Sequence, residues 1–108
     1  MLAAYRSPTA DPGRRERIRA ALRHAADVPQ QIAAAGARVA ELAADVAARG
    51  NPNLLGDAHA AVLVAEAATR AAANLVRINV ELGGLDASVN AAAQAHVTAA
   101  ATAAAGFR

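Results

Sequence analysis

The sequence predicts an all-α protein: an antiparallel helical bundle with a long, proline-kinked helix, completed by dimerisation. The 108 residues are 56% hydrophobic but only 2% aromatic, and alanine, the strongest helix former, supplies most of the apolar positions. Apolar residues also recur at alternating spacings of four and three, the period of a helix face. The length predicts a single domain over residues 1–108.

The first long helix is expected to begin at Asp11-Pro12 and to end at Gly50. Asp is a good N-cap, Pro suits the first helical position, and Gly commonly stops a helix. Pro29 removes a backbone donor and crowds the preceding turn, so the helix should kink or divide there. An apolar seam runs along this helix at Val28, Ile32, Ala35, Val39, Leu42 and Val46.

The length of this first helix argues for a partner subunit. Roughly thirty to forty helical residues span about 50 Å, whereas a compact domain of this size has a radius of gyration of about 13 Å. Alanine buries little apolar area per residue, so the core of one chain would be thin. Because the rest of one chain cannot cover such a rod, we expect a homo-oligomer, most simply a dimer.

Two shorter helices should follow. A second helix is expected over residues 57–82, with Asp57 as its N-cap, and Gly83-Gly84 should break the chain. Asp86 suits the N-cap of a final helix over residues 86–105.

The composition indicates which classes of partner and which cellular compartment to expect. The 11 basic residues, all Arg, and the 9 acidic residues give a net charge of +2. No aromatic platforms accompany the arginines, so we expect no nucleic acid partner. Residues 87–107 carry no formal charge, but their polar side chains favour a packed helix, so no membrane contact is expected. The absence of Cys and of a signal sequence fits a cytoplasmic protein.

The second helix carries a polar stripe that allows two interpretations. The stripe holds His59, Glu66, Arg70, Asn74, Arg77 and Glu81. One interpretation is a solvated face with the ion pairs Glu66–Arg70 and Arg77–Glu81 at i,i+4 spacing. The other is a row of donors, Arg70, Asn74 and Arg77, for an anionic ligand, since arginine suits carboxylates.

The opposite stripe of the second helix is predicted to be buried. It holds Ala61, Val64, Ala68, Ala72, Leu75 and Leu82. Asp57 and Asn79 share this face. A buried Asn needs hydrogen-bond partners, so Asn79 is either a structural bridge to another helix or a ligand contact. About 33 Å of helix separates Asp57 from Asn79, so the two cannot contact one small ligand in the same subunit, although an antiparallel partner could bring them together.

Other candidate sites have simpler explanations. The histidines His24, His59 and His96 lack the spacing of metal ligands, so no metal site is expected. The arginine run over residues 14–23 suits a solvated first turn, with a weak anion patch as the alternative. The Ser and Thr residues have no arranged base, so nucleophilic catalysis by a hydroxyl is not indicated.

Four segments in a fixed order carry a family resemblance. They are AAYRSP at 3–8, DVPQQIA at 27–33, ARGNPNLLGDA at 48–58 and NLVRINVEL at 74–82. With these segments the chain resembles the cyclodeaminase/cyclohydrolase family, which includes the C-terminal domain of formiminotransferase-cyclodeaminase and stand-alone methenyltetrahydrofolate cyclohydrolases. The resemblance covers nearly the whole chain, and it implies that this chain is N-terminally truncated relative to the family domain.

The resemblance implies an all-helical dimer that acts on a tetrahydrofolate derivative as substrate, with no bound cofactor. Such proteins either cyclise formiminotetrahydrofolate with loss of ammonia or hydrolyse methenyltetrahydrofolate. Asp57 is the expected catalytic residue. The expected substrate-binding residues are Asn51, Asn53, Arg77, Asn79, Tyr5 and Arg6.

In one respect this chain is expected to differ from the family: the family's catalytic acid. The acid assigned as proton donor in the family lies just upstream of the segment that matches Tyr5-Arg6, so we do not expect it in this chain. A partner chain that supplies the missing half is therefore an alternative to a homodimer. The alternative function is a non-catalytic helical assembly subunit, in which the loop and Asn79 are structural.

Overall fold

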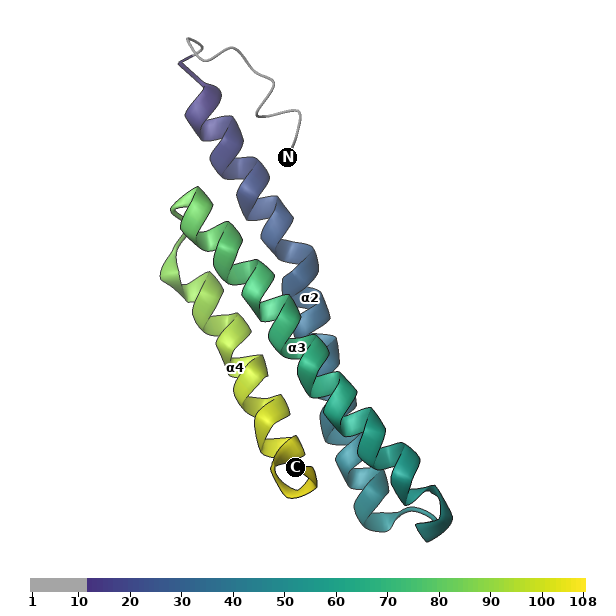
Figure 1. The fold of residues 1–108 in the computed structure, drawn as a ribbon. Helices are drawn as coiled ribbons and strands as arrows, with labels where there is room; N and C mark the ends of the chain where they lie inside the picture. The colour runs from purple at the N-terminus through teal and green to yellow at the C-terminus, as the bar shows by residue number, and fades with distance from the viewer. Residues whose placement is uncertain (1–11) are drawn as a thin grey trace.

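The computed structural model describes residues 12–108, which form an elongated bundle of three α-helices (Figure 1). The elements are α2 (Arg14–Arg49), the 3₁₀ helix η1 (Pro52–Leu54), α3 (Leu55–Gly83), α4 (Ala87–Ala104) and the 3₁₀ helix η2 (Ala105–Phe107). The described part of the chain contains no strand, so the all-α prediction is confirmed.

α2 is one continuous helix of 36 residues, which corresponds to a length of about 54 Å. It begins at Arg14, later than predicted, because Pro12 lies in a turn and Gly13 occupies the N-cap position. Asp11 lies outside the described residues. The helix runs through Pro29 without interruption, so a division at this residue is wrong. Pro29 is buried, and burial of its ring offsets part of the roughly 3 kcal/mol that an interior proline costs.

α3 returns antiparallel to α2, and α4 packs against both helices (Figure 1). Two close contacts fix the register of the α2–α3 hairpin: Gly36 faces Thr69, and Leu22 faces Gly83. Within each contact, the α2 residue and the α3 residue are the same number of residues away from the hairpin tip. The two helices therefore stay in register over about 21 Å.

The core between the helices is built mainly from alanine. The buried residues of α2 are Leu22, Ala26, Pro29, Ala33, Ala37 and Ala40. The largest fully buried side chains in the described residues are Leu22, Val62, Val76 and Thr69. Small side chains let the helices approach closely but bury little apolar area each, so the core is thin.

Most of the large apolar side chains lie outside this core. The exposed ones are Val28, Ile32, Val39, Leu42, Val46, Leu54, Leu55, Val64, Leu75, Ile78 and Leu82. The predicted buried face of α3 is therefore wrong for its large side chains, since Val64, Leu75 and Leu82 are 68%, 52% and 62% exposed, whereas Ala72 is buried as predicted. The physical reason is that α3 turns its alanine-rich side toward α2, where Thr69 and Gly36 allow a close approach.

The turn between α3 and α4 has the predicted capping. Gly84, with a φ of 56°, ends α3 in the left-handed conformation that glycine favours. The Asp86 carboxylate then caps α4 by accepting a hydrogen bond from the Ser88 backbone nitrogen at 2.8 Å. This backbone bond is the main cause that lowers the pKa of Asp86. The cap therefore stabilises the fold above the ordinary carboxyl pKa and is lost as pH falls through the lowered value.

The Gly36→Ala variant should destabilise the hairpin. A Cβ at this position would lie 2.3 Å from Thr69 Oγ1 and 3.4 Å from the Ala65 carbonyl oxygen. Relieving this overlap should cost about 1–3 kcal/mol, which exceeds the roughly 1 kcal/mol that alanine gains over glycine in a helix. Urea unfolding of the variant measures the change in the free energy of unfolding.

The matched control is Gly56→Ala, because a Cβ there would meet nothing within 4 Å. This variant should be as stable as the wild type or more stable. The double variant Gly36→Ala/Thr69→Ala removes the clashing hydroxyl and should recover part of the lost stability. If Gly36→Ala and Gly56→Ala have equal free energies of unfolding, the close approach at Gly36 is contradicted.

Candidate functional site

The tip of the α2–α3 hairpin presents three of the predicted site residues. Asn51 Oδ1 accepts a hydrogen bond from the Asn53 backbone nitrogen at 2.9 Å, and this bond caps η1. Asp57 lies in the first turn of α3. It is not the N-cap that the sequence predicts, because α3 begins earlier and Leu54 occupies the cap position. Asn51, Asn53 and Asp57 are all exposed.

The tip carries an exposed carboxylate, Asp57, a few residues after the two amides of Asn51 and Asn53. Pro52 fixes its own backbone φ, and the Asn51 side chain satisfies one of the donors of η1. Asp57 lies close to the N-terminus of α3, where the helix dipole favours a negative charge. Such a carboxylate can accept hydrogen bonds from a ligand's N–H groups or exchange a proton with it.

Arg77 lies on the exposed side of α3 and is already paired. Its Nη1 donates to Glu81 Oε1 at 2.9 Å, and its Nη2 donates to Asn74 Oδ1 at 2.7 Å. The predicted Arg77–Glu81 pair is thus confirmed. Arg77 also borders a hollow of about 200 Å³, which Arg70, Asn74 and Gln94 help to line. Both interpretations of the polar stripe, ion pairs in solvent and donors for an anion, remain compatible with this arrangement.

Asn79 is half-buried and bonds to its own helix, because its Nδ2 donates to the Leu75 carbonyl oxygen at 3.0 Å. Along α3, Asn79 lies about 33 Å and Arg77 about 30 Å from Asp57. One subunit therefore does not bring the residues of the tip together with those near the end of α3. The remaining predicted site residues, Tyr5 and Arg6, lie outside the described residues.

Glu66 forms an ion pair that the sequence analysis missed. Its side chain is only 9% exposed, and its Oε2 accepts a hydrogen bond from Arg108 Nη2 at 2.7 Å. The predicted partner was Arg70, so that pair is wrong. Arg108 lies 42 residues further along the chain, and no local pattern marks such a distant partner.

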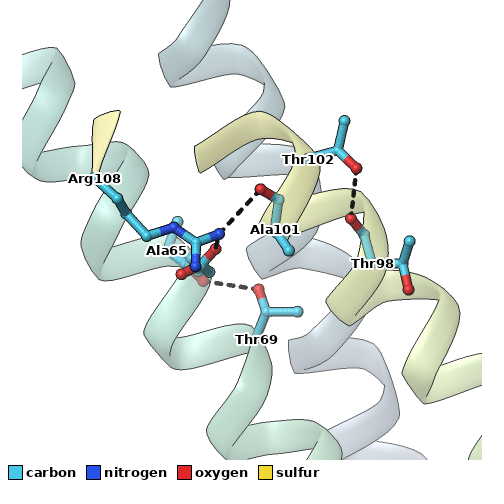
Figure 2. Close-up of polar contacts among 7 residues, drawn as sticks. Ala65, Thr69, Thr98, Ala101, Thr102 and Arg108 are labelled. Atoms are coloured by element: carbon cyan, nitrogen blue, oxygen red, sulfur yellow. Dashed lines mark hydrogen bonds and ion pairs between the residues drawn. The ribbon is translucent and has the colours of Figure 1, made fainter. Parts of the chain in front are cut away.

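Further contacts of Phe107 and Arg108 hold the C-terminal end of the chain against the bundle. Arg108 also donates to the Ala101 carbonyl oxygen at 3.2 Å, beside the buried Thr69 (Figure 2). The rings of His59 and Phe107 meet edge to face with their centres 5.1 Å apart, and His59 Nε2 contacts the Phe107 carbonyl oxygen. These contacts stabilise the bundle and leave the hairpin tip uncovered.

Two further observations concern the described residues. None of the helices α2, α3 and α4 is long and apolar enough to cross a membrane. Within residues 12–108, no three acidic or histidine side chains lie close enough together to hold a metal ion.

The sequence model of the family described as formiminotransferase-cyclodeaminase matches residues 1–99. The chain belongs to this family. The match includes the hairpin tip and the segment of α3 that holds Arg77 and Asn79, so it confirms the resemblance inferred from the four segments. Searches of curated proteins and of solved structures gave no significant match.

The Arg108→Ala variant of this formiminotransferase-cyclodeaminase family member should be less stable than the wild type. It leaves the nearly buried Glu66 carboxylate without its ion-pair partner, which should cost about 1–2 kcal/mol after allowing for the half-exposed guanidinium. Thermal unfolding followed by circular dichroism measures the loss.

Arg49→Ala is the matched control for Arg108→Ala. The Arg49–Asp45 pair is 78% and 52% exposed, so its loss should change the stability by no more than about 0.5 kcal/mol. Equal losses for the two variants would show that the Glu66–Arg108 pair has no special role in the fold.

Proposed function

We propose that this chain is a one-carbon folate enzyme, or part of one, that acts on a tetrahydrofolate derivative. The observation that supports this most strongly is the hairpin tip, where a family-matching loop carries Asn51, Asn53 and Asp57, all exposed. The reaction is either cyclisation of formiminotetrahydrofolate or hydrolysis of methenyltetrahydrofolate. The tetrahydrofolate derivative is the substrate, and no resident cofactor takes part.

Both reactions pass through a tetrahedral carbon between two folate nitrogens. In the cyclisation, the second nitrogen bonds to the formimino carbon and ammonia leaves. In the hydrolysis, water adds to the methenyl carbon and one carbon–nitrogen bond breaks, which gives the 10-formyl product. Either route needs a positioned group that moves protons and further groups that hold the folate.

Asp57 is the residue to which we assign the proton transfer or the binding of the pterin ring. Its carboxylate accepts hydrogen bonds, and the pterin edge offers N–H donors. Asn51 and Asn53 shape the loop around it and offer amide groups to the substrate. Arg77 is the candidate contact for a folate carboxylate, because arginine binds carboxylates in a fork geometry.

The working form that we propose is a cytoplasmic homodimer. The exposed apolar side chains along α2 and α3 support association. The lack of cysteine suits a reducing compartment.

A non-catalytic assembly subunit is the second candidate function. It is favoured by the hydrogen bonds that Arg77 already donates to Glu81 and Asn74. The separation of about 33 Å between Asp57 and Asn79 within one chain also favours it. In this case the tip and Asn79 would serve the packing of the assembly and not a reaction.

The Asp57→Asn variant tests the enzymatic proposal. With purified protein, the decay of methenyltetrahydrofolate absorbance should be faster than in buffer alone. Asp57→Asn should slow it by about 100- to 10,000-fold, because an amide cannot act as a general acid or base. A parallel assay with formiminotetrahydrofolate, in which methenyltetrahydrofolate absorbance appears, tests the cyclodeaminase reaction.

Asp45→Asn is the control for this test, since Asp45 is an exposed carboxylate near the same tip and pairs with Arg49. It should keep the wild-type rate. If the wild type accelerates neither reaction and binds no folate, the proposal is overturned in favour of the assembly subunit. If Asp57→Asn keeps full activity, the role of Asp57 is overturned.

A further inference from the structure

A hollow of about 200 Å³ lies between α3 and α4 and is here called the α3–α4 hollow. The two helices run side by side along this part of the bundle (Figure 1). Six residues line the hollow: Arg70, Ala73, Asn74 and Arg77 of α3, and Gln94 and Val97 of α4. The lining therefore combines a polar rim, made of guanidinium and amide groups, with an apolar floor.

We propose that the α3–α4 hollow binds a small dicarboxylate, that is, two carboxylates joined by a short methylene chain. Arg70 and Arg77 each bind one carboxylate. The amides of Asn74 and Gln94 supply further hydrogen-bond donors, and the apolar floor receives the methylene groups. The ligand is either a free dicarboxylate or the glutamate end of a folate, and only the second source rests on the proposed function.

Arg70 is an exposed cation that has no hydrogen bond or ion pair within residues 12–108. Its i,i+4 neighbour Glu66 could have neutralised it. Glu66 Oε2 instead accepts a hydrogen bond from Arg108 Nη2 at 2.7 Å. The Glu66–Arg108 pair therefore leaves the whole guanidinium fork of Arg70 available for a carboxylate.

Arg77 keeps donors for a ligand although it is paired. Its Nη1 donates to Glu81 Oε1 at 2.9 Å, and its Nη2 donates to Asn74 Oδ1 at 2.7 Å. These bonds hold the guanidinium along α3 and use only part of its N–H groups. The Asn74 amide accepts with its oxygen, so its own N–H groups stay free for the ligand. Groups that are already fixed in this way lose less conformational entropy on binding.

The charge of the α3–α4 hollow favours an anion. No carboxylate lines the hollow, and α4 carries none between Ala87 and Ala104. On α3, the acidic residues before and after the hollow, Glu66 and Glu81, are each paired with an arginine. The two guanidiniums therefore face a helix without formal charge, and the rim is positive.

The spacing of the arginines and the apolar floor favour a dicarboxylate over a compact ion. Arg70 and Arg77 lie about two turns apart on one side of α3, so their Cα atoms are separated by about 10 Å along the helix. Two planar forks at this spacing suit two carboxylates. Ala73 is 1% exposed, and Val97 packs against the buried cluster that contains it. A methylene chain gains by covering this floor, whereas phosphate or sulfate has no apolar atoms to bury.

The size of the hollow limits its ligand to a few carbon atoms. Pockets for drug-sized ligands have volumes of about 300–1,000 Å³, so a hollow of about 200 Å³ holds a small molecule or the end group of a larger one. Along α3 the hollow begins about 20 Å from Asp57. A ligand in the hollow therefore leaves the hairpin tip uncovered.

Titration of isotope-labelled protein with glutarate, followed by NMR at constant ionic strength, tests the site without any reaction. The signals of the Arg70 Nε–H and of the Asn74 and Gln94 side-chain amides should shift and saturate. Arg70→Gln should weaken binding by about 10-fold or more, because it removes a charge and a fork. Gln94→Ala, on the facing helix, should weaken it by about 3-fold or more. Circular dichroism should show that both variants stay folded, since both side chains are exposed.

Arg38→Gln is the matched control, because Arg38 is another exposed arginine without a partner in the described residues and lies on α2. It should bind glutarate as the wild type does. Butyrate, with one carboxylate, and inorganic phosphate should each bind at least about 10-fold more weakly than glutarate. Shifts that do not saturate, or equal losses for Arg70→Gln and Arg38→Gln, would assign the polar stripe to solvent and overturn the site. Butyrate or phosphate binding as tightly as glutarate would overturn the dicarboxylate.

The folate assays separate the two sources of the ligand. If the ligand is the glutamate end of a folate, glutarate should inhibit the wild-type reaction competitively, and Arg70→Gln should raise KM and leave kcat unchanged. Saturable glutarate binding without competition would identify a free dicarboxylate as the ligand. Glutarate binding without folate activity would overturn the proposed function and keep the site. Folate activity without glutarate binding would overturn the site and keep the proposed function.

Discussion

The close approach of α2 and α3 at Gly36 is the constraint on which the rest of the structure depends. Thr69 Oγ1 occupies the space that a side chain at Gly36 would need, and it donates to the Ala65 carbonyl oxygen at 2.7 Å. A contact this close requires small residues along the helix–helix boundary, and alanine supplies them. The hairpin is therefore tightly packed but buries little apolar area, and the larger apolar side chains point away from it.

The separation between an alanine-rich core and exposed large apolar side chains relates the fold to the folate site that we propose. A thin core gives a chain with a 63 Å long axis little apolar burial of its own. The exposed apolar side chains of α2 and α3 offer a surface for the homodimer that we propose. The Glu66–Arg108 ion pair holds the C-terminal end of the chain against α3.

Much of the fold could be predicted from the sequence, because local chemistry decides it. Gly50, Gly84 and Asp86 mark helix ends through backbone preferences that act within a few residues. The direction of burial could not be predicted: periodicity marks an apolar face of α3 but does not say whether α2 or another subunit covers it. The tip was found through the family motif, whereas the Glu66–Arg108 pair joins residues that only the tertiary structure brings together.

The central claim is that the helices depend on association through the exposed apolar side chains of α2 and α3. The most direct measurement is the concentration dependence of thermal unfolding, with helix content followed by circular dichroism and mass by sedimentation. If the account is correct, Tm rises with protein concentration, and loss of helix coincides with loss of the dimer. A folded monomer whose Tm is independent of concentration would contradict it.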